Sequence, residues 1–244
     1  MQLLLYCAQV ALLNQCLPQT DTFLKAAISL IPDVPTHEEL EGKRVHTEEK
    51  LASFLKYLLS TLLVTPGHPE HGPFYIVQGL LNAMPKFQWQ PNTGVQTKVY
   101  IDMLALLCTY AQRRFPYHIL HIESNDDLYG GSPDYMSELR ENIDACVQEI
   151  LKQLTALGER TESAAKLNQA RLLLDFINQI IARMQISTEL GEFILKLLDL
   201  ASKFKNTFTR GDQRYLSNTI DQLKIRANQQ KISSSFITSL KNYQ

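Results

Sequence analysis

The sequence has 244 residues, and its 24 basic and 25 acidic side chains leave it close to neutral. Leucine occurs 38 times against 17 isoleucines and 8 valines, and glycine occurs 10 times. This composition favours helices around a substantial core. It disfavours a disordered tail, a glycine-rich nucleotide fold, an all-β sandwich and a dedicated nucleic-acid binder, whose phosphate contacts need a basic surplus.

The first twenty residues carry no charged side chain. A secretory signal is disfavoured because no basic residue precedes the apolar run, and a membrane span is disfavoured because Gln9, Asn14 and Pro18 interrupt it. We expect a helix over 2–15 that is apolar on more than one face, and such a helix is usually covered on several sides. We therefore expect the chain to be the carboxy-terminal part of a longer protein, with the covering neighbour upstream.

Apolar residues at three- and four-residue spacing predict helices along the whole chain. The clearest helix runs over about 47–64, with Thr47 as the expected N-cap and Glu48 and Glu49 at the positive end of the helix dipole. Pro73 is expected at the first position of a later helix. Further helices are expected at about 20–31, 73–85, 94–114, 132–158, 161–184, 188–204, 211–227 and 233–241, and no strand is expected.

About ten helices joined by short links predict an all-α fold in which successive helices lie antiparallel. Such hairpins either close into a bundle or stack into a solenoid, and ten helices are many for one bundle. The step of about 35 to 50 residues is within the range of helical-hairpin repeats, although no repeated motif is present. We favour an α-solenoid and treat 1–244 as a single segment of it.

Cysteine and catalytic motifs give mostly negative results. The four cysteines are widely spaced, which favours small buried apolar residues in a reducing compartment over a disulfide framework; they are Cys7, Cys16, Cys108 and Cys146. The nucleophile-elbow, P-loop and dinucleotide motifs are absent from the sequence. We expect no catalytic residue, no cofactor and no enzymatic activity.

Two H-x-x-H pairs, His68/His71 and His118/His121, could bind zinc together with a neighbouring glutamate. The proline inside the first pair prevents the helical geometry that an H-E-x-x-H site requires. Hydrogen bonding or contact with solvent is therefore the favoured interpretation, and no metal site is expected. A metal-dependent enzyme that uses these loops is the less favoured alternative.

The charge is uneven, because the residues from Ala201 onward include eight basic and two acidic side chains. A basic surface of this kind could bind anionic lipid, RNA or an acidic protein. No aromatic residues alternate with the charges as they do in single-strand binders. We favour a solvated helix surface, and keep a helical-repeat adaptor that binds anionic lipid or RNA as the alternative function.

Three segments carry a family resemblance: Lys43–Leu63 (KRVHTEEKLASFLKYLLSTLL), Thr65–Phe74, and Asp127–Leu139. They resemble the carboxy-terminal region of the large solenoid subunit of retriever, which is the paralogue of the large subunit of retromer. The similarity extends over essentially the whole chain and is an overall match, with no short catalytic signature. It implies an α-solenoid of helix pairs related to HEAT repeats.

The resemblance also implies a function and a set of partners. In that family the carboxy-terminal half holds a small subunit with a metallophosphoesterase-like fold, and an arrestin-like subunit binds the amino-terminal half, which this chain lacks. The assembled complex works with sorting nexins and with the associated coiled-coil and copper-metabolism-domain proteins to recycle cargo from endosomes. We therefore expect a cytoplasmic, non-enzymatic scaffold that associates peripherally with endosomes through its partners.

Aromatic residues in the linkers are the candidates for partner binding, because a few aromatic anchors usually dominate the energy of an interface. The family motif assigns no interface role to single positions, so these candidates are chosen by residue type and loop placement. Trp89 is the strongest candidate. Packing of each ring against its own helical repeat is the slightly favoured alternative. The candidates are Phe74, Tyr75, Phe87, Trp89, Tyr117 and Tyr129.

Overall fold

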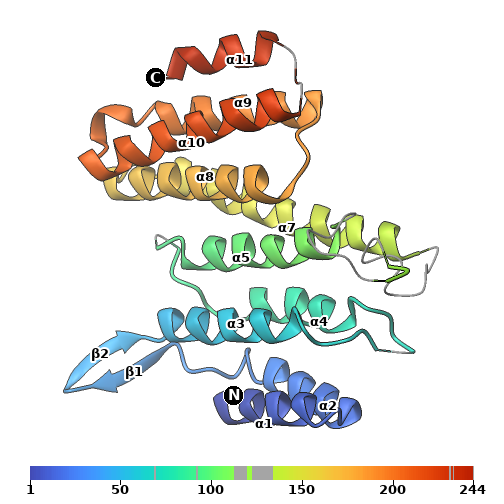
Figure 1. Ribbon diagram of the computed structural model, residues 1–244. Coiled ribbons are helices and arrows are strands. Elements are labelled where there is room, and N and C mark those ends of the chain that lie inside the picture. The colour runs from blue at the N-terminus through green and yellow to red at the C-terminus, as the bar shows by residue number, and fades with distance from the viewer. Residues whose placement is uncertain are drawn as a thin grey trace. The chain divides into compact units, whose positions relative to one another are not determined.

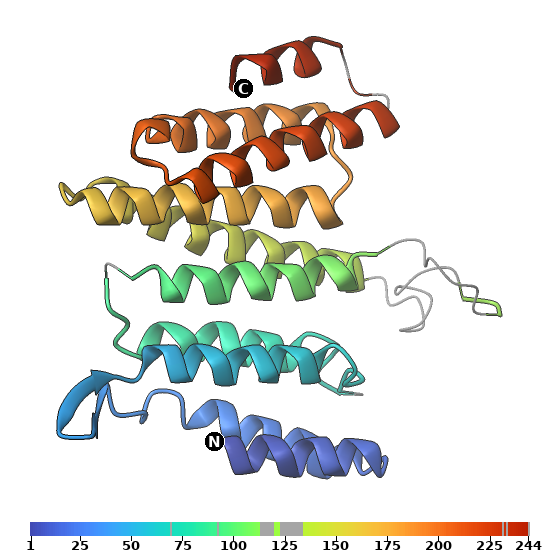
Figure 2. The ribbon, with the colours of Figure 1, turned by 60° about the vertical axis from the view of Figure 1, so that its left-hand side comes forward.

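The computed structural model describes residues 1–68, 70–91, 93–112, 120–122, 134–230, 232 and 234–243. These residues form ten α-helices, three short 3-10 helices and one two-stranded hairpin (Figures 1 and 2). The predicted all-α class is therefore confirmed. The chain divides into two compact units, of which unit 1 comprises Met1–Gln90 with Leu106–Val147 and unit 2 comprises Pro91–Ala105 with Gln148–Gln244.

Unit 1 begins with two helices, α1 (Gln2–Leu13) and α2 (Leu17–Ser29), that pack against each other as a hairpin. Leu5 and Ala8 are buried, whereas the opposite face of α1 exposes an apolar stripe at three- and four-residue spacing, formed by Leu3, Tyr6, Val10 and Leu13. The expectation that α1 is apolar on more than one face is confirmed. The expected upstream cover stays a prediction.

A β-hairpin of β1 (His37–Leu40) and β2 (Lys43–His46) follows, and the sequence did not predict it. The strands pair antiparallel from His37 opposite His46 to Leu40 opposite Lys43. Glu41 and Gly42 form the turn with φ values of 51° and 74°. Two successive positive φ values match the right-handed twist of a two-residue hairpin, but Asn, Asp or Gly usually occupies the first of these positions, so the glutamate did not signal the turn.

The next helix, α3 (Glu48–Leu62), confirms the clearest sequence prediction. Thr47 is its N-cap residue, as predicted, but the Thr47 hydroxyl donates to the carbonyl oxygen of Pro35 at 2.6 Å and makes no capping hydrogen bond to the helix. Glu48 is buried, and its Oε2 accepts the backbone N–H of Gln90 at 3.0 Å. This carboxylate therefore joins the first turn of α3 to a linker more than forty residues later in the chain.

Helix α4 (Tyr75–Ala83) packs on α2 and continues into the short helix η1 (Met84–Lys86). The sequence placed Pro73 at the first helical position, which is wrong: Phe74 is the N-cap, so Pro73 lies one residue before the cap. Proline is suited to the first turn and equally to the loop that leads into it, because it donates no backbone hydrogen bond. Residue type alone therefore did not place the boundary.

Two longer helices, α5 (Val95–Tyr110) and α7 (Tyr135–Gly158), each contribute residues to both units. Many residues of α5 are buried, as its many-sided apolar pattern predicts. The start that the sequence predicted for α7, at Ser132 and Pro133, lies outside the described residues. In unit 2, α5 begins after Gly94, whose φ is 69°. A Cβ added to Gly94 would lie 2.5 Å from Cδ1 of Leu172, so the position has no room for a side chain.

The rest of unit 2 consists of α8 (Ser163–Arg183), α9 (Thr188–Ser202), η2 (Lys205–Thr207), α10 (Arg210–Gln229), α11 (Ser234–Leu240) and η3 (Lys241–Tyr243). Helix α8 packs against α9 and α10, and its apolar stripe forms much of the core. Helix α9 begins at Thr188, as the sequence predicted, and Ser187 caps it by accepting the N–H of Leu190. None of the described helices is both long and apolar enough to cross a membrane.

Candidate functional site

The linker that ends at α4 places its first aromatic residue in the interior of unit 1. Phe74 is 1% exposed, and its ring lies 5.8 Å from that of Tyr110 and 5.0 Å from that of Tyr135. The hydroxyl of Tyr110 donates to the carbonyl oxygen of Leu62 at 2.7 Å. The hydroxyl of Tyr135 donates to the backbone carbonyl oxygen of Tyr110 at 3.1 Å. Phe74 therefore packs within its own unit, which was the favoured alternative for the linker aromatics.

The linker after η1 carries the second pair of candidates. Phe87 is buried, and Trp89 is half-buried with its ring 5.0 Å from that of Phe87 in an edge-to-face arrangement. The indole N–H of Trp89 donates to the carbonyl oxygen of Met84 at 2.8 Å, which folds the linker back onto η1. The polar atom of Trp89 is thus satisfied internally, and the exposed part of its ring is what a partner could contact.

Tyr75 is half-buried at the start of α4 and takes part in a stack of rings. The ring of His71 lies 4.7 Å from Tyr75, and the ring of His68 lies 4.4 Å from His71. The ammonium group of Lys25 is 5.2 Å from the centre of the Tyr75 ring, within the range of a cation–π contact. Tyr117 and Tyr129 lie outside the described residues. The partner-binding role of all six aromatic residues stays a prediction.

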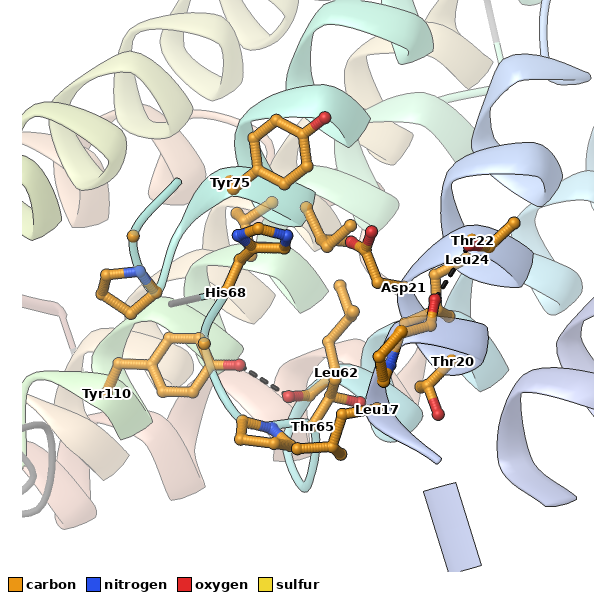
Figure 3. Close-up of a pocket in the computed structure, with 17 residues that line it drawn as sticks. Leu17, Thr20, Asp21, Thr22, Leu24, Leu62, Thr65, His68, Tyr75 and Tyr110 are labelled. Atoms are coloured by element: carbon orange, nitrogen blue, oxygen red, sulfur yellow. Dashed lines mark hydrogen bonds between the residues drawn. The ribbon is translucent and has the colours of Figure 1, made fainter. Parts of the chain in front are cut away.

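A cavity of about 500 Å³ opens beside this stack in unit 1 (Figure 3). Its walls come from the first half of α2, the end of α3, the loop after it and the first turn of α4. Apolar side chains predominate, with Asp21 and His68 among the polar ones (Figure 3). Sequence reasoning missed this cavity because its residues are 93 positions apart, from Leu17 to Tyr110, and no local pattern joins them.

The histidine pairs do not form a metal centre in the described part of the chain. No group of three or more histidine, cysteine, aspartate or glutamate side chains is arranged there so that it could hold a metal ion. His68 Nδ1 instead accepts the backbone N–H groups of Glu70 and His71, both at 3.1 Å, so it is used to shape the loop. His118 lies outside the described residues, so the second pair is not tested.

The cysteines differ partly from expectation. Cys108 and Cys146 are buried, and none of the four forms a disulfide, which agrees with small apolar residues. Cys16 is exposed between α1 and α2, and this contradicts the expectation that all four are buried. The prediction assigned Cys16 to an apolar helical segment and missed the turn before it, in which Gln15 has a φ of 58°.

The basic carboxy-terminal segment is mainly helical surface, as expected. Asp212, one of the two acidic residues of this segment, accepts hydrogen bonds from Arg171 at 2.8 and 2.9 Å. It also completes a capping box with Thr209 at the start of α10. The hydrogen bond from Arg171 lowers the pKa of Asp212 far below its ordinary value. Four basic side chains remain exposed around the α9–α10 connection: Lys203, Lys205, Arg210 and Arg214.

Together these features define an all-α protein of packed helical hairpins with partly exposed aromatic linkers and an apolar cavity. Proteins of this class use extended helical surfaces to bind other proteins. The comparisons with known proteins identify the family more narrowly. Residues 1–242 match the family model described as the VPS35L C-terminal domain, and the chain belongs to that family.

Curated relatives agree with this assignment. The chain is 36% identical over 234 residues to a Danio rerio protein named VPS35 endosomal protein-sorting factor-like, with 96% of this chain and 24% of the relative covered. The corresponding Homo sapiens protein is 36% identical over 230 residues, with 94% and 23% covered. The Drosophila melanogaster protein is 31% identical over 236 residues, with 96% and 24% covered. The chain thus spans about a quarter of the length of these relatives.

Proposed function

We propose that this chain is a non-enzymatic scaffold within an endosomal protein-sorting factor. The observation that carries the proposal is the match of residues 1–242 to the VPS35L C-terminal domain, whose curated relatives bear the name endosomal protein-sorting factor-like. The all-α construction supports it, because paired helices present a broad surface for binding proteins. The protein would lie in the cytoplasm and reach endosomes through its partners.

The finer part of the proposal concerns the partners. The helical surface of this chain would bind a small subunit with a metallophosphoesterase-like fold. An arrestin-like subunit would bind an amino-terminal region that this chain lacks, and the assembly would work with a sorting nexin and with the coiled-coil and copper-metabolism-domain proteins in cargo recycling. The linker aromatics support the first contact, since Trp89 and Tyr75 are both half-buried with part of each ring exposed.

Direct binding tests the central claim. Purified chain is titrated with the purified metallophosphoesterase-fold subunit, and we expect a 1:1 complex in size-exclusion chromatography with light scattering. Failure to form any complex at concentrations of tens of micromolar would remove this partner from the proposal. The family assignment would be unaffected by that result.

Substitutions at Trp89 locate the contact. Trp89→Ala removes the whole ring, whereas Trp89→Phe keeps a smaller aromatic ring and loses the hydrogen bond to Met84. If Trp89 contacts the partner, the Ala variant weakens binding by tenfold or more while the Phe variant stays within a few-fold of the parent. Tyr57→Ala on α3 is the control, because Tyr57 is a 61% exposed aromatic residue outside the linkers. Equal binding by all three variants would exclude Trp89 from the interface.

A second candidate function is an adaptor that binds anionic lipid or RNA through its basic surface. The exposed side chains around the α9–α10 connection favour it, since Lys203, Lys205, Arg210 and Arg214 are all exposed there. Binding through these residues would weaken steeply as salt increases. Sedimentation with phosphatidylserine vesicles and titration with single-stranded RNA, each at 50 and 300 mM salt, test it, and no salt-dependent binding to either would reject it.

A further inference from the structure

The cavity in unit 1 has the size of a ligand site. Its volume of about 500 Å³ lies within the range of roughly 300–1,000 Å³ that is usual for such sites. Leu24, Leu62 and Val77 line it, and all three are buried side chains that belong to the core. The cavity is therefore part of the packed interior of unit 1 and opens from it to the surface.

The hydroxyl groups in the wall are already used. Each of three threonine hydroxyls donates to the backbone carbonyl oxygen four residues earlier in the chain. The pairs are Thr20 with Cys16 at 3.1 Å, Thr22 with Pro18 at 2.8 Å, and Thr65 with Thr61 at 2.8 Å. The hydroxyl of Tyr110 likewise donates to Leu62 (Figure 3). Because these polar groups are satisfied by backbone oxygens, the wall that remains is chemically apolar and suits an apolar guest.

The loop at the mouth of the cavity is held in shape before any guest arrives. His68 Nδ1 accepts two backbone N–H groups of its own loop, and a backbone bridge joins His68 to Gly72 in both directions, at 3.2 and 3.0 Å. The rings of His68, His71 and Tyr75 are stacked on this loop. A preformed wall of this kind lowers the entropy that a guest must lose on binding.

The charges near the mouth are mostly negative among the described residues. Asp21 lines the cavity, and Glu138 Oε2 lies 3.5 Å from the position of a Cβ added to Gly72, which also lines it. Lys25 is the basic group beside them, and it pairs with Asp21 Oδ2 at 2.7 Å. Two carboxylates against one ammonium group favour a guest that carries positive charge near its apolar part.

The start of α4 adds hydrogen-bond donors that suit a peptide. Tyr75, Ile76 and Val77 form its first turn and all line the cavity. The backbone N–H groups of a first helical turn have no acceptor within the helix, and no side chain caps α4. The carbonyl oxygens of an extended chain could accept them while its side chains enter the apolar part.

We propose that the cavity binds an extended segment of a partner protein in which a large aliphatic side chain lies next to lysine or arginine. The aliphatic side chain fills the apolar part between α2 and α4, and the basic side chain lies over the carboxylates at the mouth. This proposal depends on the cavity and not on the proposed sorting function, so either can fail alone.

Selection from a phage-displayed library of random decapeptides against the 244-residue chain tests the proposal. Selected peptides are then synthesised, and their binding is measured by isothermal titration calorimetry. We expect an enriched consensus with leucine, isoleucine, valine or methionine beside lysine or arginine, and affinity that falls several-fold between 50 and 300 mM salt. No enriched consensus, or an acidic one, would overturn the proposal.

Matched substitutions locate the binding. Thr22 is exposed at the cavity, so Thr22→Trp places an indole in the mouth and should weaken the selected peptides at least tenfold. Thr155→Trp on α7 is the control, because Thr155 is also exposed and its hydroxyl also donates to the carbonyl oxygen four residues earlier, at 2.8 Å. Equal binding by the two variants would overturn the proposal.

Two further measurements complete the test. Asp21→Asn keeps the shape of the side chain and removes its charge, so it should weaken basic peptides about three- to tenfold and reduce their salt dependence. This variant decides the question if Thr22→Trp does not fold by circular dichroism. Native mass spectrometry of the purified chain tests for a different ligand. If the chain retains a lipid or small apolar molecule, and the Thr22→Trp variant does not, the cavity binds that ligand and the peptide proposal is overturned.

Discussion

Asp212 is expected to stabilise unit 2 through two separable interactions, and its substitutions distinguish them. It receives a bidentate hydrogen bond from Arg171 on α8, and it also accepts the backbone N–H of Thr209 in the capping box of α10. Asp212→Asn removes the charge but keeps an oxygen that can complete the box, whereas Asp212→Ala removes both. The side chains are 46% exposed at Arg171 and 13% exposed at Asp212, so solvent screens the ion pair.

The magnitudes follow from this geometry. A partly exposed ion pair contributes about 0.5–1 kcal/mol, and a helix cap contributes about 1 kcal/mol. We therefore expect Asp212→Asn to lower the free energy of unfolding by about 0.5–1 kcal/mol and Asp212→Ala by about 1.5–2 kcal/mol. In a chain of this size, the larger loss corresponds to a fall in melting temperature of roughly 3–8 °C.

Urea unfolding followed by far-ultraviolet circular dichroism measures these losses, and Arg171→Ala completes a double-mutant cycle with Asp212→Asn. Because the pKa of Asp212 is lowered in the folded state, its contribution is fully present above about pH 4 and is lost as the pH falls from there toward the folded pKa. Equal losses for the Asn and Ala variants, with no coupling to Arg171, would refute the reasoning.

Three more predictions concern other parts of the fold. Glu48→Ala removes the carboxylate that accepts the N–H of Gln90 and should cost about 1–3 kcal/mol in the free energy of unfolding. Glu48→Gln should restore most of this loss, and a urea titration measures both variants. Equal costs for the two variants would mean that the hydrogen bond contributes little. Gly94→Ala should lower the free energy of unfolding by more than about 2 kcal/mol, because the added Cβ would sit at a positive φ and 2.5 Å from Leu172. Gly79→Ala should raise stability by about 0.5–1 kcal/mol, because Gly79 lies in the interior of α4 and its added Cβ would meet no atom within 4 Å. Thermal melts that rank the two variants the other way would contradict this prediction. Burial raises the pKa of Tyr215 from 10.0 to about 12, so the folded chain should lose stability as the pH rises from 10 toward 12. The Tyr215→Phe variant should lose less stability over that range. An ultraviolet titration in which all tyrosines of the folded chain ionise near pH 10 would disprove this prediction.

The helices were predictable because each carries its own periodic signal. The stripe of Leu51, Leu55, Leu58 and Leu62 in α3 repeats at helical spacing, and the structure buries all four residues. Boundaries were less certain where several residue types suit the same position. Ser187 and Thr188 are both good caps, and only the hydrogen bond from Leu190 shows which one is used.

The β-hairpin and the cavity were missed for a different reason. His37–Leu40 and Lys43–His46 contain few apolar residues, so no period-two pattern marked them as strands. The cavity depends on which residues meet in space, and Asp21 and His68 come together only after α2, α3 and α4 have packed. Residue type and loop placement identified Trp89 as a linker aromatic, but its hydrogen bond to Met84 follows from the path of the chain.

Trp89 is the single tryptophan of the chain, and it belongs to unit 1. Its indole lies against Phe87 and is held by Met84, an environment that disappears when the linker unfolds. Intrinsic emission excited at the indole band therefore reports on one unit alone, whereas the helical signal sums over both. Comparing the two melting curves of the unmodified protein reveals directly whether its halves unfold in one cooperative event or in succession.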